Sequence, residues 1–470
     1  MEQKAIFERL APEYTVVMNE MEEVKVPVSN KICREKEMRI TGDELEYKTF
    51  FLDEYQVGQV NDMGRGHRVI LANPGAGKSV LLLSKAFKYA SMYKDSNILL
   101  TCYNSNLADS YCFKRSCANF GNDSNLHIMT FHKLVKKIYE ECLHARCADN
   151  IATPEEIQNC INLVKSGKLK LRFKAIFIDE VQIFDPQYLE LCYLLLEDAE
   201  DNTFLMAGDL NQTVRKKSRR GDVPWKKIAG VTLDFTGRVK YIRKNYRNSK
   251  QIGLYLCHML QHMNERMKML NLIDFKELEY DSFEVGETKS LALNVKTGIG
   301  RMDITKKTVD AIKEIAEKYK LSYSEIAVLF PYKQHDRIRY YNLYWLRQAL
   351  DAEDIPYSMI TSSRDGIFER KRYSDTNGVV LSTIDSSLGL DFKAVIVTGL
   401  YPYNYIYGDD FYKKEISSWN TIKGMNDDDQ LQVQSQMRAI YTACSRARDV
   451  LYVLSDLKPG SPMEEILKNR

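Results

Sequence analysis

A glycine-rich octapeptide, Ala72-Asn73-Pro74-Gly75-Ala76-Gly77-Lys78-Ser79, is the feature that most constrains the fold of this chain. It follows the apolar run Val69-Ile70-Leu71, which is typical of a buried parallel strand, and precedes a segment with helical apolar spacing from 80 to 86. Strand, glycine-rich loop and helix in this order form the context that a phosphate-binding loop needs. The sequence therefore predicts a nucleotide-binding α/β domain around this loop.

The residue types in the loop match the chemistry of a nucleoside triphosphate. Gly75 and Gly77 permit backbone conformations that turn successive N–H groups toward one anion, and the following helix adds its positive N-terminal end. Lys78 can reach the β- and γ-phosphates, and the Ser79 hydroxyl can ligate Mg²⁺. ATP with Mg²⁺ is therefore the expected ligand of residues 73–79, although Ala72 replaces the usual first glycine of the motif.

Composition and charge are those of an ordinary globular protein. The chain has 470 residues, of which 44% are hydrophobic and 28% charged, and this length is enough for two or three domains. The net charge of +3 is almost balanced, so any nucleic-acid-binding surface must be a local patch. The charged N-terminus does not resemble a signal peptide, and no apolar stretch approaches the length of a membrane span. We therefore expect a cytoplasmic protein.

Ten cysteines raise the alternative of a metal site. Cys112 and Cys117, then Cys142 and Cys147, form two C-x₄-C pairs. Neither pair has the short spacing of common zinc or iron–sulfur sites. Small buried thiols are therefore the expected state of these cysteines.

Carboxylates follow one of the apolar runs beyond the loop. Strands are expected at 97–102, 127–131, 174–178 and 203–207, with helical patterns between them. The run at 174–178 leads into Asp179-Glu180-Val181-Gln182, and the carboxyl end of a parallel strand faces the nucleotide crevice. Asp179 is thus predicted to hold Mg²⁺, and Glu180 to accept a proton from the attacking water. An acidic cap at the end of a strand is the alternative interpretation.

Further side chains suit a nucleotide site by their chemistry. The Gln56 amide can donate and accept together, as recognition of an adenine edge requires. Gln212, after the strand at 203–207, could sense the γ-phosphate or orient water. Tyr246 is a candidate ring for stacking on the base, and Arg247 is a candidate arginine finger that stabilises charge on the transferring phosphoryl group.

A basic cluster near an aromatic residue leaves two interpretations open. Five basic residues lie close before Trp225, namely Arg215, Lys216, Lys217, Arg219 and Arg220. Charge for phosphates and a ring for bases are what single-strand binding uses. A solvated surface loop explains the same pattern.

The rest of the chain predicts a second α/β domain without a phosphate loop. Strands are expected at 326–330, 379–382, 394–398 and 450–454, and helices at 306–319 and 341–350. The aromatic-rich stretch 401–430 is expected to be a surface insertion. Arg446, just before the last strand, is a candidate arginine finger that would reach the γ-phosphate when the domains close.

Taken together, these segments resemble the superfamily 1 helicases, and within them the UvrD/Rep/PcrA-like branch. The motif order agrees from Gln56 to Arg446. The segments similar to the family's Walker A, Walker B (DExQ), GDxxQ, NYR and Y-x-A-x-[ST]-R-A motifs are 72–79, 179–182, 208–212, 245–247 and 441–447. The resemblance implies that Gly389 and Asp391 contact the ribose. It also implies that single-stranded nucleic acid is contacted by Tyr103, Asn104, Phe131, His132 and Trp225.

The resemblance implies an α/β fold with two RecA-like parallel-sheet P-loop domains, a nucleotide cleft between them and a short N-terminal extension. The expected boundaries are 1–48 for the extension, 49–235 for the first domain and 236–470 for the second. The implied activity is ATP hydrolysis coupled to movement along single-stranded DNA, with RNA as an alternative track.

Two departures from the family favour considering another function. Asp385 and Leu388 stand where the family has His and Lys, so contact with a phosphate backbone is expected to weaken. The spacing between motifs also leaves little room for the large inserted subdomains used in unwinding. The alternative is a nucleic-acid-sensing or partner-gated NTPase that works with a nuclease in phage defence or DNA repair, without processive unwinding.

Overall fold

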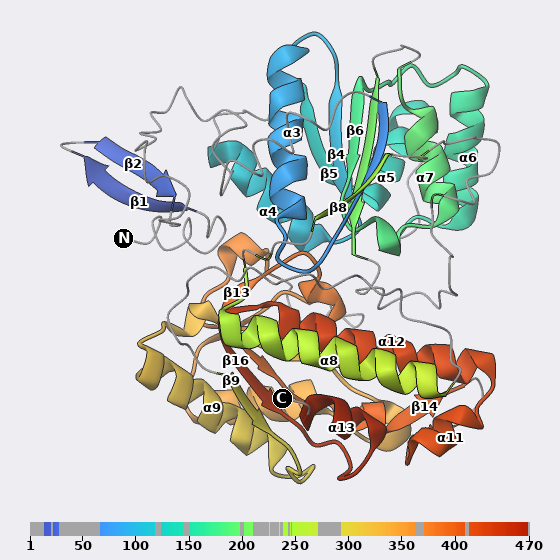
Figure 1. The fold of residues 1–470 in the computed structure, drawn as a ribbon. Helices are drawn as coiled ribbons and strands as arrows, with labels where there is room; N and C mark the ends of the chain where they lie inside the picture. Colours follow the sequence, from blue (N-terminus) through green and yellow to red (C-terminus); the bar gives the residue numbers. More distant parts are fainter. Residues whose placement is uncertain are drawn as a thin grey trace. The chain divides into compact units, whose positions relative to one another are not determined.

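The computed structural model describes residues 14–19, 22–27, 66–117, 124–143, 151–197, 202–209, 225, 235, 238–242, 245, 247–270, 293–361, 371–408 and 413–468. These residues contain two six-stranded sheets, in which every pair of neighbouring strands is parallel. The sheets belong to two compact α/β units (Figure 1). This architecture is consistent with two RecA-like domains and confirms the predicted fold class.

The first sheet has the strand order β5-β4-β6-β7-β3-β8. Its strands are β3 (Gly66–Ala72), β4 (Ile98–Cys102), β5 (Leu126–Thr130), β6 (Ala175–Ile178), β7 (Thr203–Gly208) and β8 (Val239–Ile242). The central strands β4, β6 and β7 are buried along their whole length. Parallel strands with helices on both faces are expected to show such continuous apolar runs instead of an alternation.

Within the part of the chain that the structure describes, five helices and one short 3₁₀ helix accompany this sheet. They are α3 (Lys78–Met92), α4 (Ser105–Cys117), α5 (Phe131–Leu143), α6 (Pro154–Lys165), η3 (Val181–Ile183) and α7 (Pro186–Leu194). The start of α6 shows why such boundaries are set by the sequence. Thr153 Oγ1 accepts a hydrogen bond from the Glu156 N–H, and the Glu156 carboxylate accepts one from the Thr153 N–H, which satisfies two N–H groups that the helix leaves unpaired.

One strand lies on the other side of the expected domain boundary. The sequence places that boundary at residue 236, but β8 pairs with β3 in a register that runs from Val69 opposite Val239 to Ala72 opposite Ile242. The segment Val223–Ile242, which contains β8, therefore belongs to the first unit.

The second sheet has the strand order β11-β12-β10-β13-β16-β9. Its strands are β9 (Leu293–Lys296), β10 (Ile326–Phe330), β11 (Tyr357–Met359), β12 (Val379–Thr383), β13 (Phe392–Val397) and β16 (Ala447–Leu454). The four strands predicted from apolar runs are confirmed. Strands β9 and β11, which form the two edges, were not predicted.

Helices of the second unit are α8 (Lys250–Met269), α9 (Ile304–Tyr319), α10 (Asn342–Ala352), α11 (Trp419–Lys423), α12 (Asp427–Ser445) and α13 (Pro462–Lys468). Both predicted helices, 306–319 and 341–350, are present as α9 and α10. Helices α8 and α12 lie side by side, and both contact β16 (Figure 1).

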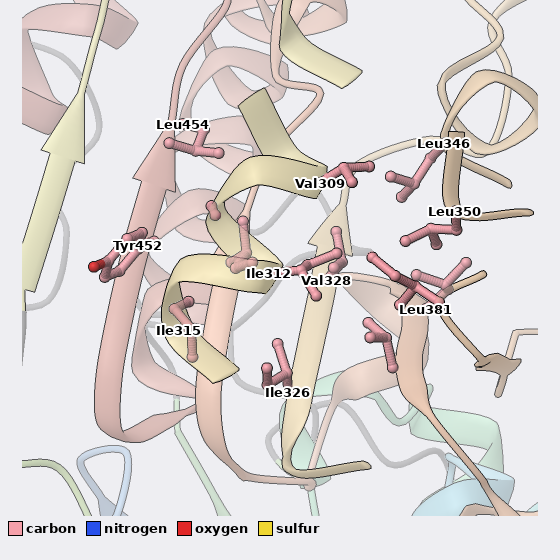
Figure 2. Packing of buried hydrophobic residues seen from close by; sticks show 14 of the residues in the cluster. Val309, Ile312, Ile315, Ile326, Val328, Leu346, Leu350, Leu381, Tyr452 and Leu454 are labelled. Atoms are coloured by element: carbon pink, nitrogen blue, oxygen red, sulfur yellow. The ribbon is translucent and has the colours of Figure 1, made fainter. Parts of the chain in front are cut away.

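The core of the second unit forms where α9 packs on the sheet. Val309, Ile312 and Ile315 of α9 are directed toward the strands (Figure 2), and each is at most 3% exposed. Opposite them lie alternate residues of β10, such as Ile326 and Val328, because successive side chains of a strand point to opposite faces. Burying each aliphatic side chain contributes about 1.5–3 kcal/mol, so this cluster is a main source of the unit's stability.

The aromatic stretch 401–430 is not the surface insertion expected from the sequence. It contains a short antiparallel hairpin of β14 (Tyr405–Tyr407) and β15 (Lys413–Glu415). Tyr403 and Tyr405 are buried at 6% exposure each, and the Tyr401 ring stacks on Tyr340 with centroids 5.7 Å apart. The aromatic residues therefore belong to the packing of the unit.

Of the N-terminal extension, the structure describes one element. Strand β1 (Tyr14–Asn19) pairs antiparallel with β2 (Glu22–Pro27). No helix in the described ranges is both long enough and apolar enough to cross a membrane.

Candidate functional site

The glycine-rich loop joins β3 to α3, as the sequence predicts. Gly75 and Gly77 have φ angles of 73° and 81°, in the left-handed region that glycine adopts without a steric cost. Gly77 is the residue immediately before α3, and Lys78 begins the helix. The Lys78 ammonium folds back over the loop and donates to the carbonyl oxygen of Ala72 at 2.9 Å.

The loop and the acidic end of β6 meet at Ser79 and Asp179. Ser79 Oγ donates a hydrogen bond to Asp179 Oδ2 at 2.6 Å, across 100 residues of sequence. The other carboxylate oxygen, Oδ1, accepts from the backbone N–H of Glu180 at 2.8 Å. A serine hydroxyl beside a carboxylate is a pair of hard oxygen donors, which are the ligands that Mg²⁺ prefers. These two residues therefore fit the predicted metal site.

Asp179 is fully buried, and its surroundings act on its charge in opposite directions. Burial, and then the adjacent Glu180 carboxylate, raise the pKa of Asp179 above its usual range. Hydrogen bonds from Ser79, from Tyr111 and from the Glu180 N–H favour the ionised form. A bound cation would act in the same direction as these donors.

Tyr111 is a member of this group that sequence reasoning missed. It lies in α4, is 2% exposed, and its hydroxyl donates to Asp179 Oδ2, the same oxygen that accepts from Ser79. Burial, and then the charge of Asp179, raise the pKa of the phenol well above its ordinary value, so the hydroxyl keeps its proton. No sequence motif marks a single tyrosine in the middle of a helix as part of a metal site.

Glu180 has an unusual backbone conformation. Its φ and ψ angles are 55° and 43°, a left-handed conformation that costs on the order of 1–3 kcal/mol for a residue other than glycine. Its carboxylate accepts a hydrogen bond from the Gln182 side-chain amide. Strain of this kind is often found at functional sites, and the catalytic role of Glu180 stays a prediction.

Gln182 connects Glu180 to the neighbouring strand. Its Nε2 donates to Glu180, while its Oε1 accepts from the backbone N–H of Asp209 at 3.1 Å. Asp209 follows β7, which lies between β6 and β3 in the sheet. A Cβ atom added to Gly208 would lie 2.5 Å from Gln182 Oε1, so the amide can occupy this position only because residue 208 has no side chain.

The second unit brings together two predicted arginines and the predicted ribose contact. Arg247 Nε donates to Asp391 Oδ2 at 3.1 Å in an ion pair. Arg446 Nη1 donates to the carbonyl oxygen of Leu390 at 3.3 Å. Gly389 has a φ angle of 76°, so it supplies the left-handed turn before this segment. Arg247, Arg446, Gly389 and Asp391 are therefore neighbours within one unit.

Asn248 holds the two arginine segments to each other. Its side-chain amide donates to the carbonyl oxygens of Ser445 at 3.1 Å and Ala447 at 2.5 Å, the residues on either side of Arg446. Asn245 Oδ1 in turn accepts from the backbone N–H groups of Arg247 and Asn248, at 2.9 and 3.2 Å. Sequence reasoning gave Asn248 no role, although it directly follows the predicted finger.

The residues predicted to contact single-stranded nucleic acid differ in their exposure. Phe131 is fully buried and stacks on Tyr188, with centroids 4.3 Å apart and an interplanar angle of 12°. His132 and Trp225 are 6% and 7% exposed. Tyr103, after the end of β4, is partly exposed, and its ring meets His132 edge-on at 5.1 Å. Asn104, just before α4, accepts the Asn106 N–H through Oδ1 at 2.8 Å.

Three predicted residues lie outside the part of the chain that the structure describes. They are Gln56, Gln212 and Tyr246, and the same holds for the basic cluster 215–220. Among the residues that are described, no three His, Cys, Asp or Glu side chains gather as a metal cluster. Seven of the ten cysteines are described as free thiols, of which Cys102, Cys160, Cys192 and Cys444 are buried.

Comparison with known families assigns the first unit at a general level. Residues 56–217 match a family model described as an AAA domain. This is a P-loop NTPase domain of the kind found in UvrD-like superfamily 1 helicases, and the matched range contains the loop, Asp179, Glu180 and Tyr111. A search of curated proteins gave no match. The chain therefore carries a P-loop NTPase domain.

Proposed function

We propose that this protein is an ATP-driven translocase on single-stranded nucleic acid, of the UvrD-like superfamily 1 type. The observation that carries the proposal is the hydrogen bond between Ser79 and Asp179. It joins the phosphate-binding loop to the carboxyl end of β6, and Glu180 follows directly. This arrangement supplies both the metal ligands and the proton acceptor that phosphoryl transfer to water needs.

Ser79 and Asp179 would hold Mg²⁺ in this proposal. Because Ser79 donates its proton to Asp179, the lone pairs of its oxygen remain for the ion. When bound, Mg²⁺ neutralises charge on the β- and γ-phosphates. Lys78, which lies over the loop, adds a second positive charge for the same phosphates.

Glu180 is the proposed proton acceptor for the attacking water. Its carboxylate accepts a hydrogen bond from the Gln182 amide through one oxygen, Oε2, and a carboxylate has further lone pairs that can accept from water. Gln182 is itself anchored to the Asp209 N–H. We propose that this anchored amide sets the direction of the Glu180 side chain and so holds its carboxylate in position to accept the proton from water.

Arg247 and Arg446 are the proposed stabilisers of charge on the transferring phosphoryl group. An arginine finger acts by electrostatics and must be held at a defined position. Asn248 provides such a restraint through the carbonyl oxygens on either side of Arg446. Arg247 pairs with Asp391, and in this proposal Arg247 would exchange that carboxylate for the phosphate.

Tyr103 is the proposed ring for stacking on a base. It follows the carboxyl end of β4, the edge of a parallel sheet at which ligands bind, and it is partly exposed. Single-stranded DNA is the proposed track, and RNA the alternative. Base stacking on one aromatic ring is worth about 1–3 kcal/mol.

One observation favours the second candidate function, an NTPase gated by nucleic acid or by a partner such as a nuclease, without processive unwinding. Leu388, which replaces the family's lysine, is 1% exposed and cannot contact a backbone phosphate. Asp385, which replaces the histidine, carries a negative charge. Both changes weaken attraction to a strand.

A binding experiment separates the two functions. Fluorescent oligo(dT) and oligo(U) would be titrated with the protein at fixed salt, with and without a non-hydrolysable ATP analogue. Tyr103→Ala should weaken binding about 5- to 150-fold, which corresponds to about 1–3 kcal/mol. Tyr344→Ala, which removes a tyrosine that is 57% exposed in α10, is the matched control and should bind normally. A wild-type protein that binds neither oligonucleotide would contradict a translocase and favour the gated NTPase.

A further inference from the structure

Tyr111 touches the proposed magnesium site without belonging to any predicted motif. It lies in α4 and reaches Asp179 across 68 residues of sequence. A structural explanation needs only that a buried tyrosine hydroxyl finds an acceptor. The choice of acceptor is informative, however, because the hydroxyl ends on the carboxylate oxygen that already accepts from Ser79.

The hydrogen bonds around Asp179 use both lone-pair sites of one carboxylate oxygen, Oδ2. A carboxylate oxygen offers about two lone-pair sites. Asp179 Oδ2 accepts from Ser79 and from Tyr111, and Oδ1 accepts from the Glu180 N–H. Oδ1 keeps one lone-pair site, but Ser79 contacts Oδ2, so a hydrated metal ion held by Ser79 would meet Oδ2 first, either directly or through one of its waters. Tyr111 and the hydrated ion therefore compete for the same lone pair.

We propose that Tyr111 is a placeholder in the metal site. Its hydroxyl bonds to Asp179 Oδ2 while the metal is absent, and it releases that oxygen when Mg²⁺ and its bound water arrive. This inference rests on the proposed magnesium site at Ser79 and Asp179. Tyr111 acts through Asp179 and is a positioning residue.

The energetic consequence follows from the burial of Asp179. A buried carboxylate without donors is strongly unfavourable, so the Tyr111 hydrogen bond stabilises the metal-free protein. In this proposal the Tyr111–Asp179 hydrogen bond is lost when the metal binds. Its free energy is therefore subtracted from the free energy of metal binding. Tyr111 thus keeps the site preformed when empty, at the cost of weaker affinity for the ion.

The test is metal affinity in Tyr111→Phe, a variant that removes the hydroxyl and keeps the ring. Mn²⁺ serves as the probe, and free Mn²⁺ is measured by electron paramagnetic resonance in the presence of a non-hydrolysable ATP analogue. The dissociation constant should fall on the order of tenfold, because hydrogen bonds to charged groups have this strength. An unchanged or higher dissociation constant would overturn the proposal.

Tyr89→Phe is the matched control for this measurement. Tyr89 lies in α3 of the same unit, is 4% exposed, and shares a hydrogen bond of 2.9 Å with Thr203 Oγ1. This variant also loses a buried hydroxyl, but away from Asp179. It should bind Mn²⁺ with the affinity of the wild type, and a gain equal to that of Tyr111→Phe would show that the effect is not specific to the site.

Thermal melting gives a second readout that does not depend on hydrolysis. Tyr111→Phe should melt below the wild type when free of metal and nucleotide, and the deficit should disappear when both are saturating. A deficit that persists unchanged in the loaded protein would show that the bond survives loading, and the placeholder role would be wrong.

Ser79→Ala separates failure of this inference from failure of the proposed site. If Ser79→Ala binds Mn²⁺ with nucleotide as the wild type does, the metal site itself is wrongly placed. If Ser79→Ala loses affinity while Tyr111→Phe matches the wild type, the metal site stands and only the placeholder role is refuted.

Discussion

Gly208→Ala tests whether Gln182 is held as tightly as the structure indicates. The added Cβ would lie 2.5 Å from Gln182 Oε1 and 2.8 Å from Val181 Cγ1, closer than non-bonded atoms approach. Val181 and Gln182 are 0% and 2% exposed and belong to the short helix η3. Neither side chain has free space, so the methyl group must displace the amide or distort the end of β7.

The magnitude follows from two contributions. Overpacking of a filled interior costs about 1–3 kcal/mol. Displacement of Gln182 also leaves the buried Asp209 N–H without its acceptor, which costs about 1–3 kcal/mol. We therefore expect the free energy of unfolding of the first unit to fall by about 2–6 kcal/mol. ATP hydrolysis should fall as well, because Glu180 loses the amide that directs it.

The assay is denaturant unfolding followed by circular dichroism, combined with ATP turnover under native conditions. Gly424→Ala is the control, since the nearest atoms to its added Cβ are 3.7 Å away and its φ angle of −81° suits any residue. Its unfolding free energy should change by less than about 0.5 kcal/mol. A Gly208→Ala protein with unchanged stability and unchanged turnover would refute the reasoning, because Gln182 would then be free to move aside.

Three further predictions concern charged groups. Lys78→Ala should abolish ATP hydrolysis in a turnover assay, and unchanged turnover would contradict the phosphate-loop assignment. Glu180→Gln should retain binding of a fluorescent ATP analogue while hydrolysis slows strongly; loss of binding would contradict its role as proton acceptor. Burial raises the pKa of Asp456 from 3.8 to about 6, so the folded protein retains a proton that the unfolded chain loses. The contribution of Asp456 to the free energy of unfolding should therefore fall by about 3 kcal/mol as pH rises from about 4 to 6. Asp456→Asn should remove this part of the pH dependence of the unfolding free energy. An unchanged pH dependence would refute the raised pKa of Asp456.

The parts of the fold that were predicted depend on local patterns. The octapeptide at 72–79 determines its own strand, loop and helix, because glycines, a lysine and apolar runs act over a few residues. The proximity of Ser79 and Asp179 followed from a general property of parallel sheets, whose carboxyl ends share one edge. Long continuous apolar runs gave the buried strands, such as β6 and β10.

The strands that were missed have weaker signals. Strand β11 has three residues, and β9 is a half-exposed edge strand. The predicted boundary between the two domains, at residue 236, missed a strand of the first sheet for a related reason. Strand β8 joins the first sheet through pairing with β3, and no pattern within four residues indicates which sheet a strand will join.

The unpredicted members of the site are linked to it only by the folded structure. Tyr111 reaches Asp179 from the middle of a helix, and Asn248 reaches the residues that flank Arg446 from a segment about 200 positions earlier. Gln182 was part of a recognised motif, but its bond to the Asp209 N–H depends on the close approach at Gly208. Contacts of this kind depend on tertiary packing, which sequence spacing does not specify.

The most direct test of the proposed function is ATP hydrolysis by the purified protein, measured without nucleic acid, with single-stranded DNA and with single-stranded RNA. Glu180→Gln serves as the inactive control for contaminating activity. Strong stimulation by one nucleic acid is the result we predict, and it would identify the track. Turnover that depends on Glu180 but ignores both nucleic acids would contradict the translocase and point to gating by a protein partner.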